Sequence, residues 1–259
     1  METLALFVRQ PQAKKTKTRL AKVIGEENTL RLYSAFLCDL AETCAQWAQQ
    51  SVGVDPNRRL VLYAEPDVED PVLAEIARRT GARTCSQVEG DLGERMRSCI
   101  EDEFNRGARS VCIIGSDSPH LMCHQLDHAF RALMWHHVVL GPSFDGGYWL
   151  VGSQRPAPDL FTDIPWSTSD VTRATLERCR NLGGAEPHLL PLSFDVDTAE
   201  DVQRLACHLF GTGTARHTWN AMLDMELIDD VGRVLFEVPT QEKPGGKSGK
   251  KAKGKRGAA

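Results

Sequence analysis

VCIIGSDSPHL, residues 111–121, is the stretch from which the fold can be inferred. Residues 111–114 form a short, β-branched apolar run that stops at turn-forming residues, which predicts a buried strand. In open α/β sheets, ligands bind beyond the carboxyl ends of the strands. We therefore expect Asp117 to lie at a ligand site, where it could hold a divalent cation beside a phosphate. Alternatively, Asp117 caps the following turn, as aspartate before Ser-Pro often does.

Strands and helices alternate along the rest of the chain. Short apolar runs predict strands, and three- to four-residue apolar spacing predicts helices. We expect strands at 3–8, 59–64, 82–86, 111–114, 137–140, 148–151 and 189–194, and helices at 30–49, 71–80, 90–106, 121–134, 168–181 and up to about 209. This alternation is typical of the α/β class, with a Rossmann-like, mixed but mostly parallel sheet covered by helices on both faces.

The composition divides the chain into three parts. We assign residues 1–210 to the α/β domain, 211–240 to a partly ordered C-terminal extension and 241–259 to a disordered basic tail. The tail carries seven basic residues and one acidic residue, whereas the other 240 residues have a net charge of −10. An acidic body argues against a specific nucleic-acid partner. The tail could touch RNA or membrane surfaces without specificity, or it could be a solvated extension without a role.

Several classes of protein are not expected. No apolar run approaches the roughly 20 residues that span a bilayer, so no transmembrane segment is predicted. The N-terminal residues lack the basic region and cleavage site of a signal peptide, and a cytoplasmic enzyme is the default expectation. The eight cysteines form no CxxC pair, which argues against a cysteine-based metal site. No GxGxxG follows the first strand, which argues against a nicotinamide enzyme.

The loop after the first predicted strand is rich in cations. Lys17 and Arg19 stand where this loop meets a helix. Helix N-termini and basic side chains both favour phosphate oxygens, so the two residues could clamp a diphosphate. The alternative is a solvated basic loop.

A second candidate group is GDLGERM, residues 90–96. Asp91, Glu94 and Arg95 could contact a substrate at the start of the predicted helix. Acidic residues in a first helical turn also complement the helix dipole without any further role.

The stretch GPSFDGGY, residues 141–148, places Asp145 before two glycines, Gly146 and Gly147. Glycines allow a close backbone approach or a positive φ. Asp145 could contact an acceptor hydroxyl, acting as a base. Asp-Gly is also a good hairpin turn.

The stretch DVDTAED, residues 195–201, places Asp195 and Asp197 two apart in an extended segment, so their side chains should share one face. Thr198 can cap the following helix, with acidic residues in its first turn. Asp197 could be a second metal ligand or only part of this helix start.

Three histidines, His120, His124 and His128, lie four residues apart in a predicted helix. This spacing suggests a zinc site, but the glutamate of HExxH is missing and a further ligand would have to come from elsewhere. We expect a polar surface stripe instead.

Six motifs, in this order, resemble one bacterial family of small GT-A-type glycosyltransferases that includes members for arsenosugar biosynthesis. They are KTRLA (17–21), GDLGERM (90–96), GSDSPHL (115–121), GPSFDGGYWLVG (141–152), IPWSTSDV (164–171) and DVDTAED (195–201). The resemblance covers roughly residues 3–207 and implies a nucleotide-diphospho-sugar transferase fold. DVDTAED is also similar to a metal-binding segment of sugar-nucleotide cytidylyltransferases.

With this resemblance we assign roles to the candidate residues. Asp117 and Asp197 are expected to hold Mg²⁺ or Mn²⁺, and Asp145 is expected to act in catalysis. The expected substrate- or nucleotide-binding residues are Lys17, Arg19, Asp91, Glu94, Arg95, Ser116, Gly146, Gly147 and Trp166. The family's first loop usually resembles P-x-P-G-x-x-KTRL, but Ala13 and Lys14 replace its second proline and its glycine. An altered donor or weaker nucleotide binding could follow.

Three functions remain open on the sequence. The first is metal-dependent transfer of a sugar from a nucleotide-diphospho-sugar to a small acceptor. The second is nucleotidyl transfer with release of pyrophosphate, since one fold can serve both chemistries. The third is nucleotide binding without catalysis. The sequence does not predict the base, the sugar, the acceptor or the oligomeric state.

Overall fold

The computed structural model describes residues 1–50, 57–66, 70–156, 159–182 and 186–239. Its strands are β1 (Glu2–Arg9), β2 (Arg58–Glu65), β3 (Arg83–Ser86), β4 (Ser110–Ile114), β5 (Val138–Pro142), β6 (Tyr148–Ser153) and β7 (His188–Leu189). Its helices are α1 (Thr18–Ile24), α2 (Glu26–Gln49), α3 (Pro71–Thr80), α4 (Leu92–Asn105), α5 (Cys123–Ala132), α6 (Val171–Asn181), α7 (Ala199–Leu209) and α8 (Arg216–Asp224).

The strands form a single mixed sheet in the order β3-β2-β1-β4-β6-β5-β7. β1 pairs in parallel with β2 on one side and with β4 on the other, so that Leu6 stands between Leu62 and Ile114. Only β6 runs antiparallel to its neighbours among the described strands. The predicted mixed, mostly parallel sheet is thus confirmed. The chain order reverses between β1 and β4, which is where open α/β sheets bind ligands.

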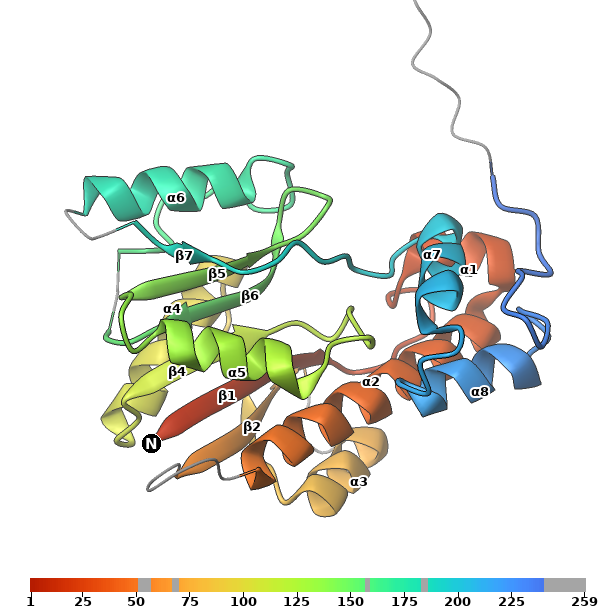
Figure 1. Ribbon diagram of the computed structural model, residues 1–259, viewed down its shortest axis with the longest axis horizontal. Helices are drawn as coiled ribbons and strands as arrows, with labels where there is room; N and C mark the ends of the chain where they lie inside the picture. The colour runs from red at the N-terminus through yellow and green to blue at the C-terminus, as the bar shows by residue number, and fades with distance from the viewer. Residues whose placement is uncertain (51–56, 67–69, 157–158, 183–185, 240–259) are drawn as a thin grey trace, which may run out of the picture.

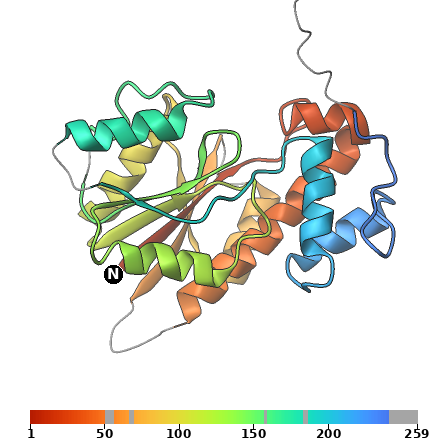
Figure 2. The same cartoon turned by 45° about the horizontal axis from the view of Figure 1, so that its top comes forward.

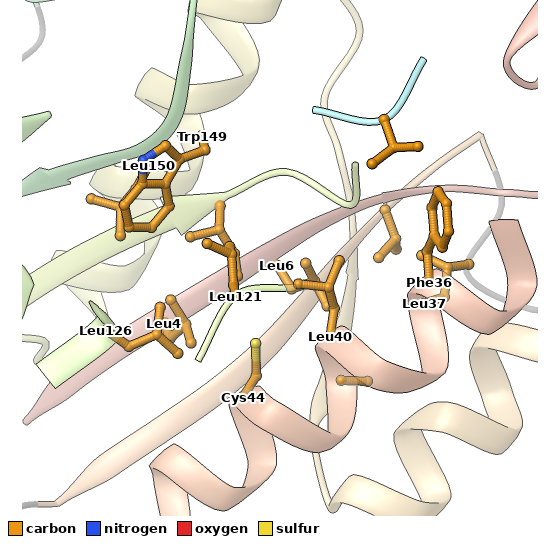
Figure 3. Close-up of a cluster of buried hydrophobic side chains, with 14 of the residues drawn as sticks. Leu4, Leu6, Phe36, Leu37, Leu40, Cys44, Leu121, Leu126, Trp149 and Leu150 are labelled. Atoms are coloured by element: carbon orange, nitrogen blue, oxygen red, sulfur yellow. The ribbon is translucent and has the colours of Figure 1, made fainter. Parts of the chain in front are cut away.

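Helices cover both faces of the sheet, as expected (Figure 1). Because side chains alternate along a strand, Leu4 and Leu6 pack toward α2 and α5, whereas Ala5 and Phe7 pack toward α4 on the other face. The first of these cores is shown in Figure 3, where Leu4 and Leu6 meet side chains of α2 and α5. Two separate apolar layers therefore hold the sheet and fix the positions of its strand ends.

Several element boundaries differ from the prediction. The first helical region starts earlier and is two helices, α1 and α2, because Gly25 between them has a φ of 84°. α6 begins at Val171, after Ser167 with its positive φ, rather than at residue 168. The extended segment expected at 189–194 keeps only the short β7, followed by a bridge between Ser143 and Ser193.

The C-terminal extension packs against the domain. Asp39 of α2 accepts hydrogen bonds from the backbone N–H groups of His217 (3.0 Å) and Thr218 (2.7 Å), which caps α8. Beyond α8, Ile228 and Val234 form an isolated antiparallel bridge. α1, α7 and α8 gather at one end of the molecule (Figure 2). The predicted disordered tail, 241–259, lies outside the described residues.

None of the described helices is both long and apolar enough to cross a membrane.

Candidate functional site

A pocket of about 570 Å³ opens at the carboxyl ends of β1, β2 and β4, where the strand order reverses. The start of β6 and the segment before α7 complete its wall. It is lined by Phe7, Val8, Arg9, Lys15, Thr16, Lys17, Tyr33, Glu65, Gln87, Gly90, Leu92, Arg95, Gly115, Ser116, Asp117, Ser118, Tyr148, Trp149, Ser167, Asp195 and Asp197. The pocket therefore gathers residues from all six sequence motifs.

Lys17 joins the two predicted metal ligands. Its Nζ lies 2.6 Å from Oδ1 of Asp117 and 3.1 Å from Oδ1 of Asp197. The Lys17 side chain is only 4% exposed, whereas the two carboxylates are 43% and 47% exposed. The ammonium group thus sits below the carboxylates, which face the open pocket. Sequence reasoning placed all three residues at one site, and the structure brings them together.

The charge of Lys17 is maintained despite its burial. Burial lowers the pKa of this ammonium group, but the nearby charges of Asp117 and Asp197 outweigh burial and raise the pKa above its ordinary value. The rings of Tyr33 and Phe36 each lie 5.7 Å from Nζ and add a favourable cation–π contact. A permanent positive charge therefore stands at the inner end of the pocket.

Two backbone features place the aspartates side by side. The backbone N–H of Val196 donates to the backbone oxygen of Asp117 at 2.9 Å, which ties the segment before α7 to the end of β4. Thr198 and Asp201 form the capping box of α7. The helix start thus uses these two side chains, and the carboxylate of Asp197 is left for Lys17.

Ser116 lies beside a residue that sequence reasoning missed. Its hydroxyl shares a 2.8 Å hydrogen bond with the hydroxyl of Tyr33, which also donates to the backbone oxygen of Arg9 at 3.0 Å. Burial, followed by the charge of Asp117, raises the pKa of Tyr33 to about 12. Tyr33 belongs to the apolar face of α2, and aromatic residues at such three- and four-residue spacing usually pack inside, so the sequence pattern indicates only a core role for it.

Asp195 also faces the pocket, as the alternation of DVDTAED predicted. Its Oδ1 accepts a 2.6 Å hydrogen bond from the hydroxyl of Ser118. Burial, followed by the charges of Asp117, Asp145 and Asp197, raises the pKa of Asp195 to about 7. The carboxyl group was not among the predicted site residues, since a sequence pattern does not reveal which of two neighbouring aspartates is buried.

Arg95 belongs to a charged rim on the β2 side of the pocket. It forms an ion pair with Glu65, whose Oε2 is also 3.3 Å from Nη2 of Arg9. Its Nε donates to the backbone oxygen of Gly90 at 3.1 Å. The hydrogen bond from Arg95 is the main cause that lowers the pKa of Glu65. Arg95 was predicted as a site residue, whereas Glu65 was missed because it ends an ordinary strand pattern.

The two acidic residues of GDLGERM form hydrogen bonds within the start of their own helix, α4. Asp91 and Glu94 form the capping box of α4, with both side-chain-to-backbone hydrogen bonds at 2.9 Å. They line a smaller pocket of about 270 Å³ beside Phe161. This is the helix-start role that the sequence left open. Neither residue lines the main pocket of the described structure.

The Asp145 loop lies next to the pocket without lining it in the described structure. Oδ1 of Asp145 accepts hydrogen bonds from the hydroxyl of Ser143 and from the backbone N–H of Gly147. Gly146 has a φ of 91°, and a Cβ there would come within 2.1 Å of the backbone oxygen of Ser169. Only glycine fits this turn, so Gly146 has a structural reason for its identity.

Two further predicted residues also lie away from the pocket lining. Arg19 is exposed on α1. Trp166 packs over Gly93, where a Cβ would meet its ring at 2.9 Å, and its ring contacts those of Tyr148 and Phe161. Among the described residues, the pocket lining therefore includes Lys17, Arg95, Ser116, Asp117 and Asp197 of the predicted set.

The carboxylates fit a hard divalent cation. Mg²⁺ and Mn²⁺ prefer oxygen ligands and commonly take one or two carboxylates together with substrate phosphates. Lys17 contacts only Oδ1 of Asp117 and of Asp197, so the second oxygen of each carboxylate can face an ion in the pocket. Within the described residues, no three His, Cys, Asp or Glu side chains are arranged to hold a metal on their own. A substrate phosphate would have to complete the coordination.

Comparisons with known proteins agree with this geometry. A family model described as uncharacterized proteins conserved in bacteria, DUF2064, matches residues 48–168, less than half of the chain. A crystal structure from Desulfovibrio desulfuricans G20, provisionally named a nucleotide-diphospho-sugar transferase, superposes with a TM-score of 0.75 at 27% identity, over 86% of this chain and 96% of that one. The chain has a nucleotide-diphospho-sugar transferase fold.

A second relative points to a related chemistry. The phosphoenolpyruvate guanylyltransferase of Sphaerobacter thermophilus is 29% identical over 139 residues, which are 54% of this chain and 67% of that protein. A cytidylyltransferase from Leptospira borgpetersenii shows a weaker structural likeness, at 12% identity and a TM-score of 0.49, over 86% of this chain and 94% of that one. The names of the two stronger relatives describe transferases of nucleotide-linked groups.

Proposed function

We propose that this protein transfers a sugar from a nucleotide-diphospho-sugar to a small acceptor. The observation that carries the proposal is the convergence of Lys17, Asp117 and Asp197 at the reversal point of the sheet, inside a pocket of about 570 Å³. A pocket of this volume lies within the range of small-molecule sites. The structural relative provisionally named a nucleotide-diphospho-sugar transferase, which covers most of the chain, supports the same substrate class.

The inner end of the pocket suits a diphosphate leaving group. Lys17 supplies a fixed positive charge where negative charge develops as the sugar departs, and such preorganised charge favours the transition state. The ion pairs to Asp117 and Asp197 hold Nζ in place before the substrate arrives. Mg²⁺ or Mn²⁺ held by these two carboxylates would neutralise the diphosphate further. Ser116 lies beside them, with its hydroxyl donated to that of Tyr33, so that its oxygen can accept a hydrogen bond.

The nucleotide base and the acceptor would then occupy opposite ends of the pocket. The rim formed by Arg9, Glu65 and Arg95 offers both donors and acceptors to a base. We place the acceptor near the Asp145 loop. Both hydrogen bonds to Asp145 use Oδ1, so Oδ2 is the atom that would accept a proton from an acceptor hydroxyl.

Nucleotidyl transfer is the second candidate, and the likeness to a guanylyltransferase favours it. In that reaction a phosphate or phosphorylated acid attacks the α-phosphate of a nucleoside triphosphate, and pyrophosphate leaves. The same lysine and carboxylates would stabilise the pyrophosphate. The two reactions differ in their products, so product analysis separates them.

The test has two stages. First, nucleotides and nucleotide-sugars, including guanine nucleotides, are screened by thermal shift with and without Mn²⁺. The compounds that bind are then incubated with candidate acceptors, and nucleoside diphosphate and pyrophosphate are measured. Release of nucleoside diphosphate supports the proposal, release of pyrophosphate supports the second candidate, and binding without either product indicates a binding protein.

A variant pair shows that the product comes from this site. Asp117→Asn should abolish metal-dependent turnover while the variant stays folded, because it removes one carboxylate charge facing the pocket. Asp102→Asn, an exposed position on α4, is the matched control and should keep full turnover. Full activity of Asp117→Asn would refute the site assignment. A role in arsenosugar biosynthesis and a cytoplasmic location stay predictions, since neither stronger relative's name concerns them.

A further inference from the structure

Three histidines gather at the other end of the sheet from the nucleotide pocket. His128 lies on α5, His136 lies in the turn after α5, and His188 begins β7. The ring centroids of His128 and His188 are 5.2 Å apart, and those of His136 and His188 are 5.0 Å apart. None of these residues has a role in the proposed transfer. The expected stripe of His120, His124 and His128 does not form, because His120 is buried before the start of α5.

The backbone holds the three side chains in this arrangement. His188 pairs with Val139 of β5 in the sheet, so its Cα position is fixed by β-structure. The backbone N–H of His136 donates to the backbone oxygen of Ala132 at 2.9 Å, which closes the turn after α5. The histidines therefore come from three segments that the fold places together.

The spacing of two ring nitrogens is the decisive observation. Nε2 of His128 lies 3.3 Å from Nε2 of His188. Two imidazole nitrogens at about 2.0–2.1 Å from one tetrahedral Zn²⁺ ion are separated by roughly 3.3 Å. Without an ion, the two rings share a long hydrogen bond at this distance, which a metal ion could replace. The two nitrogens thus have a separation suited to a shared ion.

The protonation of His188 also suits a ligand. Partial burial lowers its pKa, and the neighbouring His128 and His136 lower it further. Neutral imidazole is the form that binds a metal, since the ligating nitrogen must carry a free lone pair. All three rings reach solvent, because His128 is exposed and the other two are partly exposed.

We propose that His128 and His188 form a surface site for a transition-metal ion that prefers imidazole, such as Zn²⁺, Ni²⁺ or Cu²⁺. In the described part of the chain, no three such side chains already converge on one point. His136 therefore becomes the third ligand by rotation of its side chain, and water completes the coordination. The bound ion would link α5 to β7, the strand that leads toward Asp195 and Asp197.

The test uses Ni²⁺ as the probe, because imidazole suits Ni²⁺ whereas free thiols compete for Zn²⁺ and Cu⁺. Millimolar Mg²⁺ is kept present to occupy the carboxylates of the nucleotide pocket. Isothermal titration of the full chain should show one Ni²⁺ per chain. His128→Ala and His188→Ala should each weaken binding at least tenfold, and His136→Ala should weaken it less.

The matched control is His124→Ala, an exposed histidine one turn earlier on the same helix, which should bind Ni²⁺ as the unmodified chain does. Thermal unfolding without metal shows whether each variant is folded, and exposed His128 is the position at which a folding defect is least expected. Ni²⁺ should raise the melting temperature of the unmodified chain but not of His128→Ala. Equal Ni²⁺ affinity in His128→Ala and the unmodified chain, or an equal loss in His124→Ala, would overturn the proposal.

Discussion

Replacing Lys17 by methionine separates the stability of the site from its chemistry. The change removes a charge that is 4% exposed and lies within about 3 Å of two carboxylates. Removing one partner of a fully buried ion pair typically costs about 3–5 kcal/mol. Asp117 and Asp197 are nearly half exposed and can be hydrated again, and methionine fills the space beside Tyr33 and Phe36. We therefore expect the free energy of unfolding to fall by only about 1–2 kcal/mol.

In Lys17→Met, the loss of turnover should be far larger than the loss of stability. Loss of one preorganised donor to a developing negative charge typically lowers kcat by about 10²–10³-fold. The assay is steady-state turnover of the substrate found in the nucleotide screen, with urea unfolding of the same samples. Lys22→Met, at an exposed position on α1, is the control and should leave both quantities unchanged. A Lys17→Met protein that turns over within threefold of the unmodified chain would refute the assigned role of Lys17.

Three further predictions concern the surroundings of the site. Lys14 has a φ of 63°, so Lys14→Gly should raise the free energy of unfolding by about 1 kcal/mol in urea titrations, because glycine adopts this backbone without strain. Gly146→Ala should lower the unfolding free energy by more than about 1 kcal/mol and reduce turnover, because the added Cβ meets the backbone of Ser169. His120 is buried and burial lowers its pKa to about 3, so the unfolded chain binds the proton more readily below about pH 6.5. Stability should then fall toward pH 5 by up to about 1.4 kcal/mol per pH unit, and His120→Phe should make the urea midpoint less dependent on pH.

The centre of the sheet was predictable because its buried strands are short apolar runs, and most helices were predictable because they have one apolar face. β1, β2 and β4 appear within two residues of the predicted ranges, since burial on both faces leaves a continuous apolar pattern. α1 and β7 were not predicted at their observed lengths. Gly25 interrupts a region without a strong apolar pattern, and β7 depends on pairing with a distant strand rather than on its own sequence.

The candidate site was predictable where residues follow strands and uncertain where residues begin helices. Lys17, Asp117 and Asp197 stand beyond strand ends or just before a helix, and topology brings such positions together. Asp91 and Glu94 stand at a helix start, where the same residue types cap the helix. The sequence of this motif favours the helix-start role over a substrate contact, and the hydrogen bonds of the folded chain show that role.

The two carboxylates that flank Lys17 come from positions 80 residues apart, and the lysine itself lies a further 100 residues before the first of them. During synthesis, Lys17 and Asp117 can therefore pair long before Asp197 leaves the ribosome. The early pair would satisfy the buried ammonium group with one carboxylate, and the second would join when the segment before α7 bonds to the end of β4. The stretch 48–168 that the family model matches contains neither Lys17 nor Asp197. A fragment limited to that stretch would lack β1, the strand that joins β2 to β4, together with the charged centre that we assign to catalysis.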